Sequence, residues 1–356
     1  MQVAVVGVGL IGGSIALGAR QRLGATTVGF DTASDALEMA LERGAIDIAA
    51  DDLKSAVAGA DAAFVAAPVG ALPELVGATL SAAREDCVVT DVGSTKRSVV
   101  TANADPRFVG GHPLAGAETT GVRYARADLF DGATWYLTPS GTTSGVLYER
   151  LYRMLHGLGA LPCAIDADKH DSILATVSHL PHVLANVLVT QAAMTLAEGD
   201  EQLPATGPSF RDATRVAGAS SRIWTDIYLS NRDALANALE HMQNALERAR
   251  QALRSADAQW LERWNDEASA ARRKLLEDEL AGAELFELRA SVPNRPGVVA
   301  QLALELGRAG VNISDMALYP AADMSEGVIA LWVAGEEAAQ RAEEMVASLG
   351  FPVARA

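Results

Sequence analysis

Cysteine and aromatic residues are scarce in this sequence, and their scarcity limits what the protein can be. Only two cysteines occur among the 356 residues, Cys87 and Cys163, and both stand in apolar, strand-like runs. We therefore expect two buried thiols in a reducing compartment rather than a disulfide framework. Aromatic residues account for 5% of the chain and hydrophobic residues for 49%, so we expect globular cores built mainly from Ala, Val, Leu and Ile.

Positive charge and long apolar runs are also in short supply. Acidic residues outnumber basic ones, 45 to 29, and the formal net charge is -16 at pH 7. Because such a surface repels a phosphate backbone and no stripe of Lys and Arg stands out, we expect no nucleic-acid partner. The apolar N-terminal stretch lacks a basic start and is interrupted by Gly7, Gly9, Gly12 and Gly13. We expect no secretory signal, no membrane span and a cytoplasmic protein.

Three stretches with different periodicity indicate three domains in a chain of α/β class. In residues 1–166, short β-rich runs alternate with amphipathic segments, which is typical of a Rossmann-like, doubly wound parallel sheet. In residues 167–282 the strand signal disappears and apolar residues recur at helical spacing, so we expect an all-α domain. Residues 284–356 show the order β-α-β-β-α-β, which is the ferredoxin-like order.

The first motif with chemical meaning is rich in glycine and lies between an expected strand and an expected helix. Its glycines allow a tight turn and a close approach of the backbone to a pyrophosphate at the positive end of the helix. Asp31 ends the next strand, where its carboxylate would bind a ribose hydroxyl and repel a 2'-phosphate, so NAD is favoured over NADP. Glycines in a plain strand-to-helix turn are the alternative. The expected NAD-binding residues are Gly7, Gly9, Leu10, Ile11, Gly12 and Asp31, together with Ser94.

Two later loops carry polar residues that indicate catalysis. Residues 91–96 follow a strand, and loops at the carboxyl ends of parallel strands face the ligand crevice, so Ser94 and Lys96 are candidates for contacts near the nicotinamide. A helix N-cap is the alternative for this motif. His112, with Glu118 a few residues later, lies between glycines and a proline in an expected strand-end loop. A neutral imidazole titrates near the working pH, which favours a general base at His112.

Pairs of histidines and arginines mark the expected helical domain. His179 and His182 lie three residues apart on one helix face and are suited to bind a substrate. A metal is the weaker interpretation, because no Cys or carboxylate at ligand-like spacing accompanies them, and a structural role in the core is the other alternative. Arg211 and Arg215, upstream of Trp224, are one helical turn apart. A guanidinium is a natural partner for a substrate carboxylate, although an internal ion pair with a nearby aspartate would explain the arginines as well.

Together these motifs resemble the prephenate dehydrogenase family, in the same order and over almost all of residues 1 to about 254. Two of them, HPLAG and SHLPH, are much more specific than the glycine motif. The matching segments are GVGLIGGSIA (7–16), DVGSTK (91–96), GGHPLAGAETTGVRYARADLF (110–130), HDSILATVSHLPH (170–182), and FRDATRVA (210–217) with IWTDI (223–227).

The resemblance implies a reaction and a set of roles. The reaction would be the NAD-dependent oxidative decarboxylation of prephenate to 4-hydroxyphenylpyruvate in tyrosine biosynthesis, with arogenate as the alternative substrate and no metal. His112 would be the catalytic histidine, and Ser94 would orient it and the nicotinamide. The residues expected to bind substrate are His179, His182, Arg215 and Trp224, with Glu118 near the pocket mouth and Arg211 as a further candidate.

The last seventy residues resemble an ACT domain, which implies a regulatory ligand. Given the expected pathway, feedback inhibition by tyrosine is the hypothesis, and a plain dimerisation module with an exposed sheet edge is the alternative. A homodimer is expected, because helical domains and ACT domains both pair in such proteins. The expected regulatory residues are Asn294, Pro296, Gly297, Gly310 and Asn312.

Two other functions stay open for the sequence. A Rossmann-type hydroxy-acid dehydrogenase commonly uses a catalytic lysine on its helical domain, where Lys169 is the candidate. A non-catalytic regulator that responds to NAD and an amino acid would also fit an ACT-like segment. His112 in its glycine-rich loop favours the prephenate dehydrogenase interpretation over the first, and the set of His112, Ser94 and Arg215 favours it over the second.

Overall fold

The computed structural model of the chain falls into two compact units. The first unit joins Met1–Gln202 with Thr214–Met242, and the second joins Leu203–Ala213 with Gln243–Ala356. The domain limits expected at residues 166 and 282 stay predictions. The structure describes residues 1–116, 119–197, 206–279, 284–295, 297–321 and 325–355.

A large sheet forms the centre of the first unit. Its strands are β1 (Gln2–Val6), β2 (Thr26–Phe30), β3 (Ile48–Ala49), β4 (Ala62–Val65), β5 (Val88–Asp91), β6 (Phe108–Pro113), β7 (Thr134–Thr138) and β8 (Leu161–Ala164). Within the described residues they form eight strands in the order β3-β2-β1-β4-β5-β6-β7-β8. The strand order reverses between β1 and β4, which is the switch point where Rossmann-like sheets bind ligands. The Rossmann-like domain is therefore confirmed, although β6 and β7 pair antiparallel in a sheet that is otherwise parallel.

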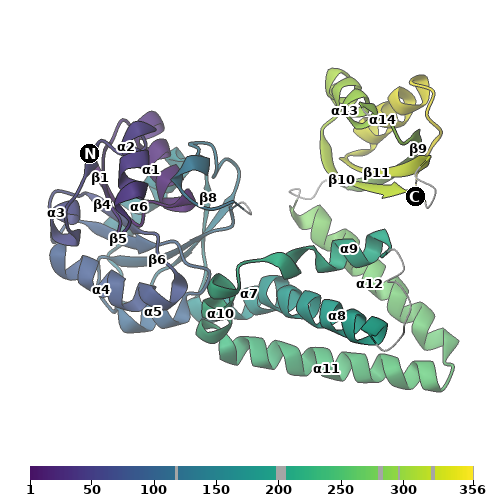
Figure 1. Cartoon of the computed structure of the whole chain (residues 1–356), viewed down its shortest axis with the longest axis horizontal. Coiled ribbons are helices and arrows are strands. Elements are labelled where there is room, and N and C mark those ends of the chain that lie inside the picture. Colours follow the sequence, from purple (N-terminus) through teal and green to yellow (C-terminus); the bar gives the residue numbers. More distant parts are fainter. Residues whose placement is uncertain (117–118, 198–205, 280–283, 296, 322–324, 356) are drawn as a thin grey trace. The chain divides into compact units, whose positions relative to one another are not determined.

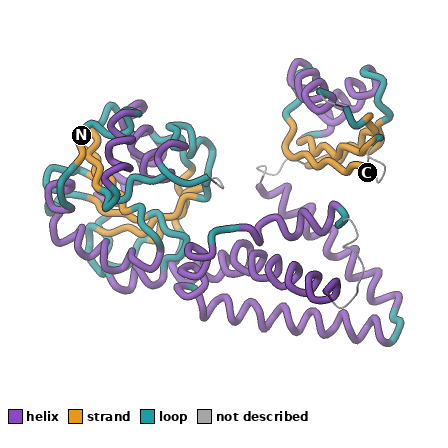
Figure 2. Tube along the Cα trace, viewed as in Figure 1, coloured by secondary structure: helices purple, strands orange, loops and turns teal. Residues whose placement is uncertain are grey.

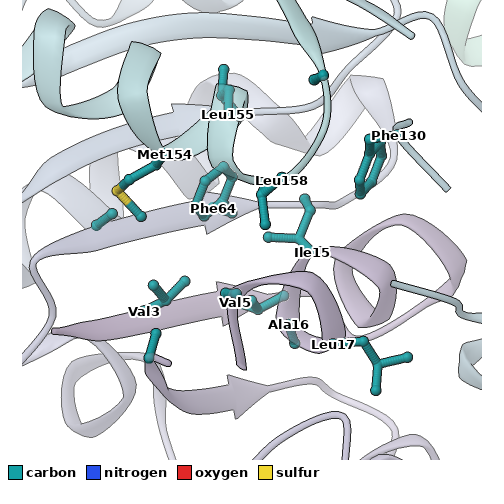
Figure 3. Packing of buried hydrophobic residues seen from close by; sticks show 14 of the residues in the cluster. Val3, Val5, Ile15, Ala16, Leu17, Phe64, Phe130, Met154, Leu155 and Leu158 are labelled. Atoms are coloured by element: carbon teal, nitrogen blue, oxygen red, sulfur yellow. The ribbon is translucent and has the colours of Figure 1, made fainter. Parts of the chain in front are cut away.

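Helices cover both faces of this sheet (Figure 1). They are α1 (Leu10–Leu23), α2 (Ser34–Glu42), α3 (Leu53–Val57), α4 (Leu72–Ala82), α5 (Arg97–Ala102) and α6 (Gly145–Gly157), with short 3-10 turns η1 (Val69–Ala71) and η2 (Val122–Tyr124). Because successive residues of a strand point to opposite faces, Val5 packs into a core with Ile15 of α1, whereas Ala4 and Val6 pack into a second core with α3 and α4. Figure 3 shows the first core, where Val5 and Phe64 lie near Ile15.

The two cysteines differ in exposure, so the prediction that both are buried is wrong for one of them. Cys87 is buried, whereas Cys163 is exposed. Cys163 lies on β8, at the edge of the sheet, where Leu161 is also 56% exposed. An apolar run therefore indicated the strand correctly but not its place at the edge, where a strand has a neighbour on one side only.

The region after the large sheet is helical, as the sequence predicts. A continuous run consists of α7 (Ala167–Leu174), a π-helical turn η3 (Ala175–His179) and α8 (Leu180–Ala197). The helices that follow are α9 (Pro208–Thr214), the 3-10 turn η4 (Arg215–Gly218), α10 (Ser221–Ser230), α11 (Arg232–Arg254) and α12 (Ala258–Glu279).

The helical run from α7 to α8 is long and apolar. In the described part of the chain, Ala167–Thr195 is the stretch long and apolar enough to cross a membrane, with a mean hydropathy of 1.5 and 28% of its most apolar window buried. The expectation that the chain has no membrane span stays a prediction. Length and composition alone are weak evidence for a span, because a helix from a soluble protein passes the same test. The large apolar side chains exposed on α8 are Val187, Leu188, Val189 and Met194.

The C-terminal part of the second unit is a small antiparallel sheet with two helices on one face (Figure 2). Its elements are β9 (Leu285–Pro293), α13 (Val298–Arg308), β10 (Ile313–Pro320), β11 (Glu326–Ala334), α14 (Glu336–Ser348) and β12 (Val353–Arg355). The described strands lie in the order β10-β11-β9-β12. On β9, buried Leu288 and Ala290 alternate with exposed Arg289 and Ser291, so one face of the sheet meets the helices and the other does not.

Candidate active site

The glycine motif forms a tight turn between β1 and α1. Gly7 has φ +95°, and a Cβ built on it would lie 2.1 Å from the carbonyl oxygen of Ala66. A Cβ on Gly12 would lie 2.0 Å from the carbonyl oxygen of Gly7. A Cβ on Gly9, in contrast, would meet no atom within 4 Å. Two of the glycines are therefore required by the turn and its packing, and Gly9 leaves open space at the N-terminus of α1, where a pyrophosphate can approach the backbone.

Asp31 connects this turn to the end of β2. One carboxylate oxygen accepts a hydrogen bond from the backbone N–H of Val8 at 2.7 Å, and the other accepts from that of Ala33 at 2.9 Å. Each carboxylate oxygen has a second lone pair. Asp31 therefore braces the glycine turn and keeps acceptor capacity for a ribose hydroxyl, which fits the NAD site expected from the sequence.

His112 lies inside β6 rather than in a loop after it. The flanking glycine and proline predict a loop, but β7 pairs with β6 as far as Pro113 and extends the strand over the motif. His112 is buried, at 8% exposed. Burial is the main cause that lowers the pKa of His112 well below its usual range, and the nearby His170 and Lys96 add to the effect. The imidazole is therefore neutral at neutral pH, as a proton acceptor must be.

His170 and Asp171 of α7 lie behind His112, and they are not among the residues predicted from the sequence. Nδ1 of His112 is 2.9 Å from Nε2 of His170, and Nδ1 of His170 is 2.8 Å from a carboxylate oxygen of Asp171. Both residues stand in the motif HDSILATVSHLPH, next to the two histidines that were chosen. Their distance from His112 along the chain, 58 residues for His170, left no local signal that would join them to it.

Lys96 does not face the cofactor site, contrary to the prediction from the sequence. Its side chain is fully buried, is ion-paired with Asp91 and donates to the carbonyl oxygen of Gly111 at 2.6 Å. Burial lowers the pKa of Lys96, and the carboxylate of Asp91 opposes that shift. Asp91 also accepts from the backbone N–H groups of Gly93 and Gly111. This ion pair ties the end of β5 to β6 and so supports the strand that carries the catalytic candidate.

A cavity of about 360 Å³ opens beside His112 and Ser94. Trp224 also lines a second cavity of about 710 Å³, together with His182 and Arg215. Both volumes are in the range of sites for small molecules. The lining of the first cavity consists of Ser94, His112, Pro113, Leu114, Ala115, Tyr136, Ile173, Leu174, Val177, Ser178, His179, Trp224 and Ile227.

The two histidines expected to bind substrate both contact Trp224. His182 stacks on the indole with ring centroids 3.3 Å apart, and His179 meets it edge-on at 6.1 Å. Nδ1 of His179 is 3.1 Å from the amide nitrogen of Asn231, so Nδ1 is the acceptor and Nε2 carries the proton. Burial lowers the pKa of His179 to about 4. Its Nε2 is buried without a hydrogen-bond partner among the described groups, which leaves a donor for a bound molecule.

The remaining substrate candidates are only partly brought together. Arg215 lies on the turn η4 and lines the second cavity near His182, whose pKa is lowered by burial and by the charge of Arg215. Arg211 belongs to the other compact unit, on α9, where it donates to the carbonyl oxygen of Thr206. Glu118 lies outside the described residues, as does Pro296 among the regulatory candidates.

The other regulatory candidates lie at opposite ends of α13. Gly297, with φ +90°, caps the start of this helix next to Asn294, whereas Gly310, with φ +70°, and Asn312 follow its end. A small cavity of about 60 Å³ is lined by Asn294 but not by the other turn. The structure therefore does not gather the regulatory candidates into one cavity.

Among the described residues, no three His, Cys, Asp or Glu side chains gather as a metal would require. A glycine turn braced by Asp31, together with a cavity lined by His112 and Ser94, defines the class of the protein as an NAD-dependent dehydrogenase with a helical region after its Rossmann-like sheet.

Known proteins show which dehydrogenase family this is. The model of the family "Prephenate dehydrogenase, nucleotide-binding domain" matches residues 15–162, and that of "Prephenate dehydrogenase, dimerization domain" matches residues 166–267. The prephenate dehydrogenase of Bacillus subtilis is 31% identical over 97% of this chain and 95% of its own length. The cyclohexadienyl dehydrogenase of Zymomonas mobilis is 33% identical over 78% of this chain and 96% of its own. The chain belongs to the prephenate dehydrogenase family.

Solved structures agree with this assignment. The prephenate dehydrogenase of A. aeolicus, in complex with hydroxyphenyl propionate and NAD+, has a TM-score of 0.70 at 28% identity and covers 77% of this chain and 98% of its own. The arogenate dehydrogenase of Synechocystis has a TM-score of 0.68 at 27% identity and covers 77% of this chain and 100% of its own. The protein is thus an NAD-dependent oxidoreductase, and the hydroxy-acid dehydrogenase and regulator alternatives are not needed.

Proposed function

We propose that this prephenate dehydrogenase oxidises its substrate in the cavity beside Ser94, with His112 as the general base. The observation that carries the proposal is a neutral, buried imidazole that lines this cavity. A base must be unprotonated before the reaction and within reach of the hydroxyl whose proton it takes. Lys169, the candidate base of a hydroxy-acid dehydrogenase, is exposed and does not line the cavity, which also favours His112.

The substrate is a cyclohexadienol that carries a ring carboxylate and a side-chain carboxylate. His112 takes the proton of the ring hydroxyl while the hydrogen on the same carbon leaves as hydride. NAD, when bound, supplies the acceptor for that hydride. The resulting ring ketone loses its ring carboxylate as carbon dioxide, and the electron pair of the broken bond makes the ring aromatic. The phenolate oxygen then takes a proton, which protonated His112 can return.

The chain holds NAD through the turn between β1 and α1. Gly9 leaves room for the pyrophosphate at the start of α1, and Asp31 accepts from the ribose. Ser94 lines the cavity with His112, which suits it to orient the nicotinamide against the substrate. These residues supply alignment, and alignment of the reacting groups is a large part of the rate enhancement.

The substrate carboxylates meet positive charge and N–H donors on the helical side of the cavities. Arg215 is suited to pair with one carboxylate, because a guanidinium binds a carboxylate with two parallel hydrogen bonds. Nε2 of His179 is an N–H donor without a partner among the described groups, in the same cavity as His112. Trp224, shared by both cavities, provides an apolar wall for the ring.

Prephenate is the substrate we propose, since the prephenate dehydrogenase of Bacillus subtilis aligns over 97% of this chain. Arogenate is the second candidate, because an arogenate dehydrogenase has a TM-score of 0.68 with this fold. Initial rates of NAD reduction with each substrate test the choice, and repeating them with NADP tests the role of Asp31.

The variant His112→Asn should turn over far more slowly while NAD still binds, and an unchanged rate would rule His112 out as the base.

The protein is further proposed to be a cytoplasmic homodimer that tyrosine inhibits. The dimer is supported by the family description of residues 166–267 and by the apolar side chains exposed on α8. Regulation is supported by the β-α-β-β-α-β unit that follows the helical region, with an ACT-like order of elements. A light-scattering mass tests the dimer, and a tyrosine titration tests the regulation.

A further inference from the structure

A chain of three side chains runs from α7 to the cavity. Asp171 contacts Nδ1 of His170 at 2.8 Å, and Nε2 of His170 contacts Nδ1 of His112 at 2.9 Å. We propose that Asp171 and His170 are positioning residues that fix the tautomer of His112 and share the charge it gains. This inference rests on His112 being the base.

The carboxylate of Asp171 sets the direction of every hydrogen bond in the chain. It accepts from the backbone N–H groups of Lys96 at 2.7 Å and Arg97 at 2.9 Å, as well as from His170. Burial opposes ionisation of Asp171, but the hydrogen bonds from His170, Arg97 and Lys96 outweigh burial and lower its pKa. An ionised carboxylate only accepts, so Nδ1 of His170 must be the donor.

The tautomers of both imidazoles follow from this direction. In a neutral imidazole one nitrogen donates and the other accepts. With His170 in its neutral form, Nδ1 donates to Asp171 and Nε2 accepts, so Nδ1 of His112 carries the proton between the two rings. Nε2 of His112 is left with the lone pair, and it is the one nitrogen of the three-residue chain that can take a proton from a substrate.

The surrounding groups hold this arrangement in place. The amide nitrogen of Asn231 donates to the backbone oxygen of Asp171 at 2.7 Å, and Tyr136 packs edge-on against His170 with centroids 5.5 Å apart. The charged and titratable groups that face His112 are His170 from α7, His179 from η3 and Lys96 from the segment after β5, which is paired with Asp91.

Proton transfer to His112 creates an imidazolium in a buried site. The proton taken from the substrate stays on Nε2, while the proton on Nδ1 is shared with Nε2 of His170. As positive charge spreads to His170, the carboxylate of Asp171 stabilises it through Nδ1. The arrangement is thus a carboxylate that acts on the base through a second imidazole, in the way that the buried aspartate of a serine protease acts through one.

The pH dependence of kcat/KM tests the role of the carboxylate. Loss of the negative charge in Asp171→Asn destabilises the imidazolium of His112, so the acid limb of the profile should move to lower pH. The plateau should fall by roughly 10²- to 10⁴-fold, as expected when a base is held in the wrong tautomer. KM for NAD should not change. The matched control is Asp168→Asn on the same helix. The carboxylate of Asp168 is 70% exposed and forms a surface ion pair with the guanidinium of Arg97. This variant should keep both the plateau and the acid limb.

A pair of substitutions at His170 gives a second test that does not depend on Asp171. Glutamine places an oxygen near the former Nε2 and can still accept from His112, whereas asparagine reaches only the position of Nδ1. His170→Gln should therefore keep clearly more of kcat than His170→Asn. If His170 only holds Asp171 in place, asparagine would do as well as glutamine or better, which would overturn the proposal.

The outcomes also distinguish a failure of the positioning role from a failure of His112 as the base. An active His112→Asn variant would refute the base itself. An inactive His112→Asn variant, combined with an unmoved acid limb in Asp171→Asn, would refute the positioning role alone. If Asp171→Asn does not fold, as judged by thermal melting and NAD binding, the comparison of the two His170 variants decides.

Discussion

At the scale of single residues, the glycines of the turn between β1 and α1 do different work. A Cβ on Gly12 would overlap the carbonyl oxygen of Gly7, at 2.0 Å, whereas a Cβ on Gly9 would point into open space. The two positions are thus chemically identical in the sequence but not in the fold. The packing of the turn requires Gly12, whereas Gly9 leaves space for the proposed approach of the pyrophosphate.

The substitutions Gly9→Ala and Gly12→Ala should separate these needs. Gly12→Ala should lower the free energy of unfolding by about 1–3 kcal/mol or more, because the new methyl group has no room. Gly9→Ala should melt like the unmodified protein and raise KM for NAD, because the methyl group occupies the approach of the pyrophosphate. Thermal melting and NAD kinetics on both variants check this, and a stable Gly12→Ala variant would contradict it.

His179 should make the stability of the protein depend on pH. Burial lowers its pKa to about 4, whereas the unfolded chain has the ordinary value near 6.5. Between these two values the unfolded state binds more protons, so stability rises with pH across this window and is lost as the pH falls. The loss is on the order of 3 kcal/mol in full. Urea unfolding from pH 7 down to pH 4 measures the slope, and His179→Gln should make it less steep, while the buried His112 keeps its own share.

At the scale of helices and strands, the sequence predicts most elements because burial leaves a clear pattern. Strands β1 and β4 are almost wholly buried and appear as continuous apolar runs. The two-residue strand β3 is too short to leave such a pattern. The antiparallel direction of β7 was also missed, because an alternation of strands and helices predicts parallel pairs and carries no sign of a reversal.

The sequence predicts those residues of the candidate site whose own local motif indicates a function. It does not predict contacts between distant segments. Ser94, His112, His179 and Trp224 were chosen from separate segments, and they line one cavity. His170 could not be joined to His112, because the contact depends on how α7 meets β6 in space. Lys96 was misjudged for a related reason, since a lysine in a loop is usually solvated and only the fold reveals its buried partner Asp91.

The apolar face of α8 leads to a prediction about the proposed dimer. Val187 is 55% exposed and Met194 is 61% exposed, which is costly if these side chains meet water. Lysine at either position should weaken the dimer, because a charge would be buried in the interface. The matched control is Val146→Lys on α6, where a valine is 70% exposed on a different element. Light scattering across a dilution series measures the effect, and a dimer that resists both α8 variants would exclude this face.

At the scale of the whole molecule, the chain combines the regions of a dehydrogenase with a small antiparallel sheet and its two helices at the C-terminal end. The family models end at residue 267, and the β-α-β-β-α-β unit lies beyond them. Such a unit can change turnover only if a ligand binds its states with different affinity.

Tyrosine is the effector that the proposed function favours. Added tyrosine should lower the initial rate of NAD reduction, and phenylalanine serves as the matched control, since it lacks only the hydroxyl. Loss of the side-chain amide in Asn294→Ala should weaken inhibition while basal turnover stays the same, because Asn294 lies in the second compact unit. If tyrosine does not change the rate, dimerisation is the role that remains for the small C-terminal sheet and its helices.

The π-helical turn at Ala175–His179 links the movement of the proposed positioning residues to that of the proposed substrate residues. It stands between the part of the helix that carries His170 and Asp171 and the part that begins just after His179. A π turn contains more residues than an α turn, so it rotates the second part about the helix axis relative to the first. One continuous helical run therefore carries the proposed positioning residues before the π turn and the proposed substrate residue His182 after it. The two sets face directions that a regular α-helix would not give them. Any tilt of this helical run moves both sets of residues together.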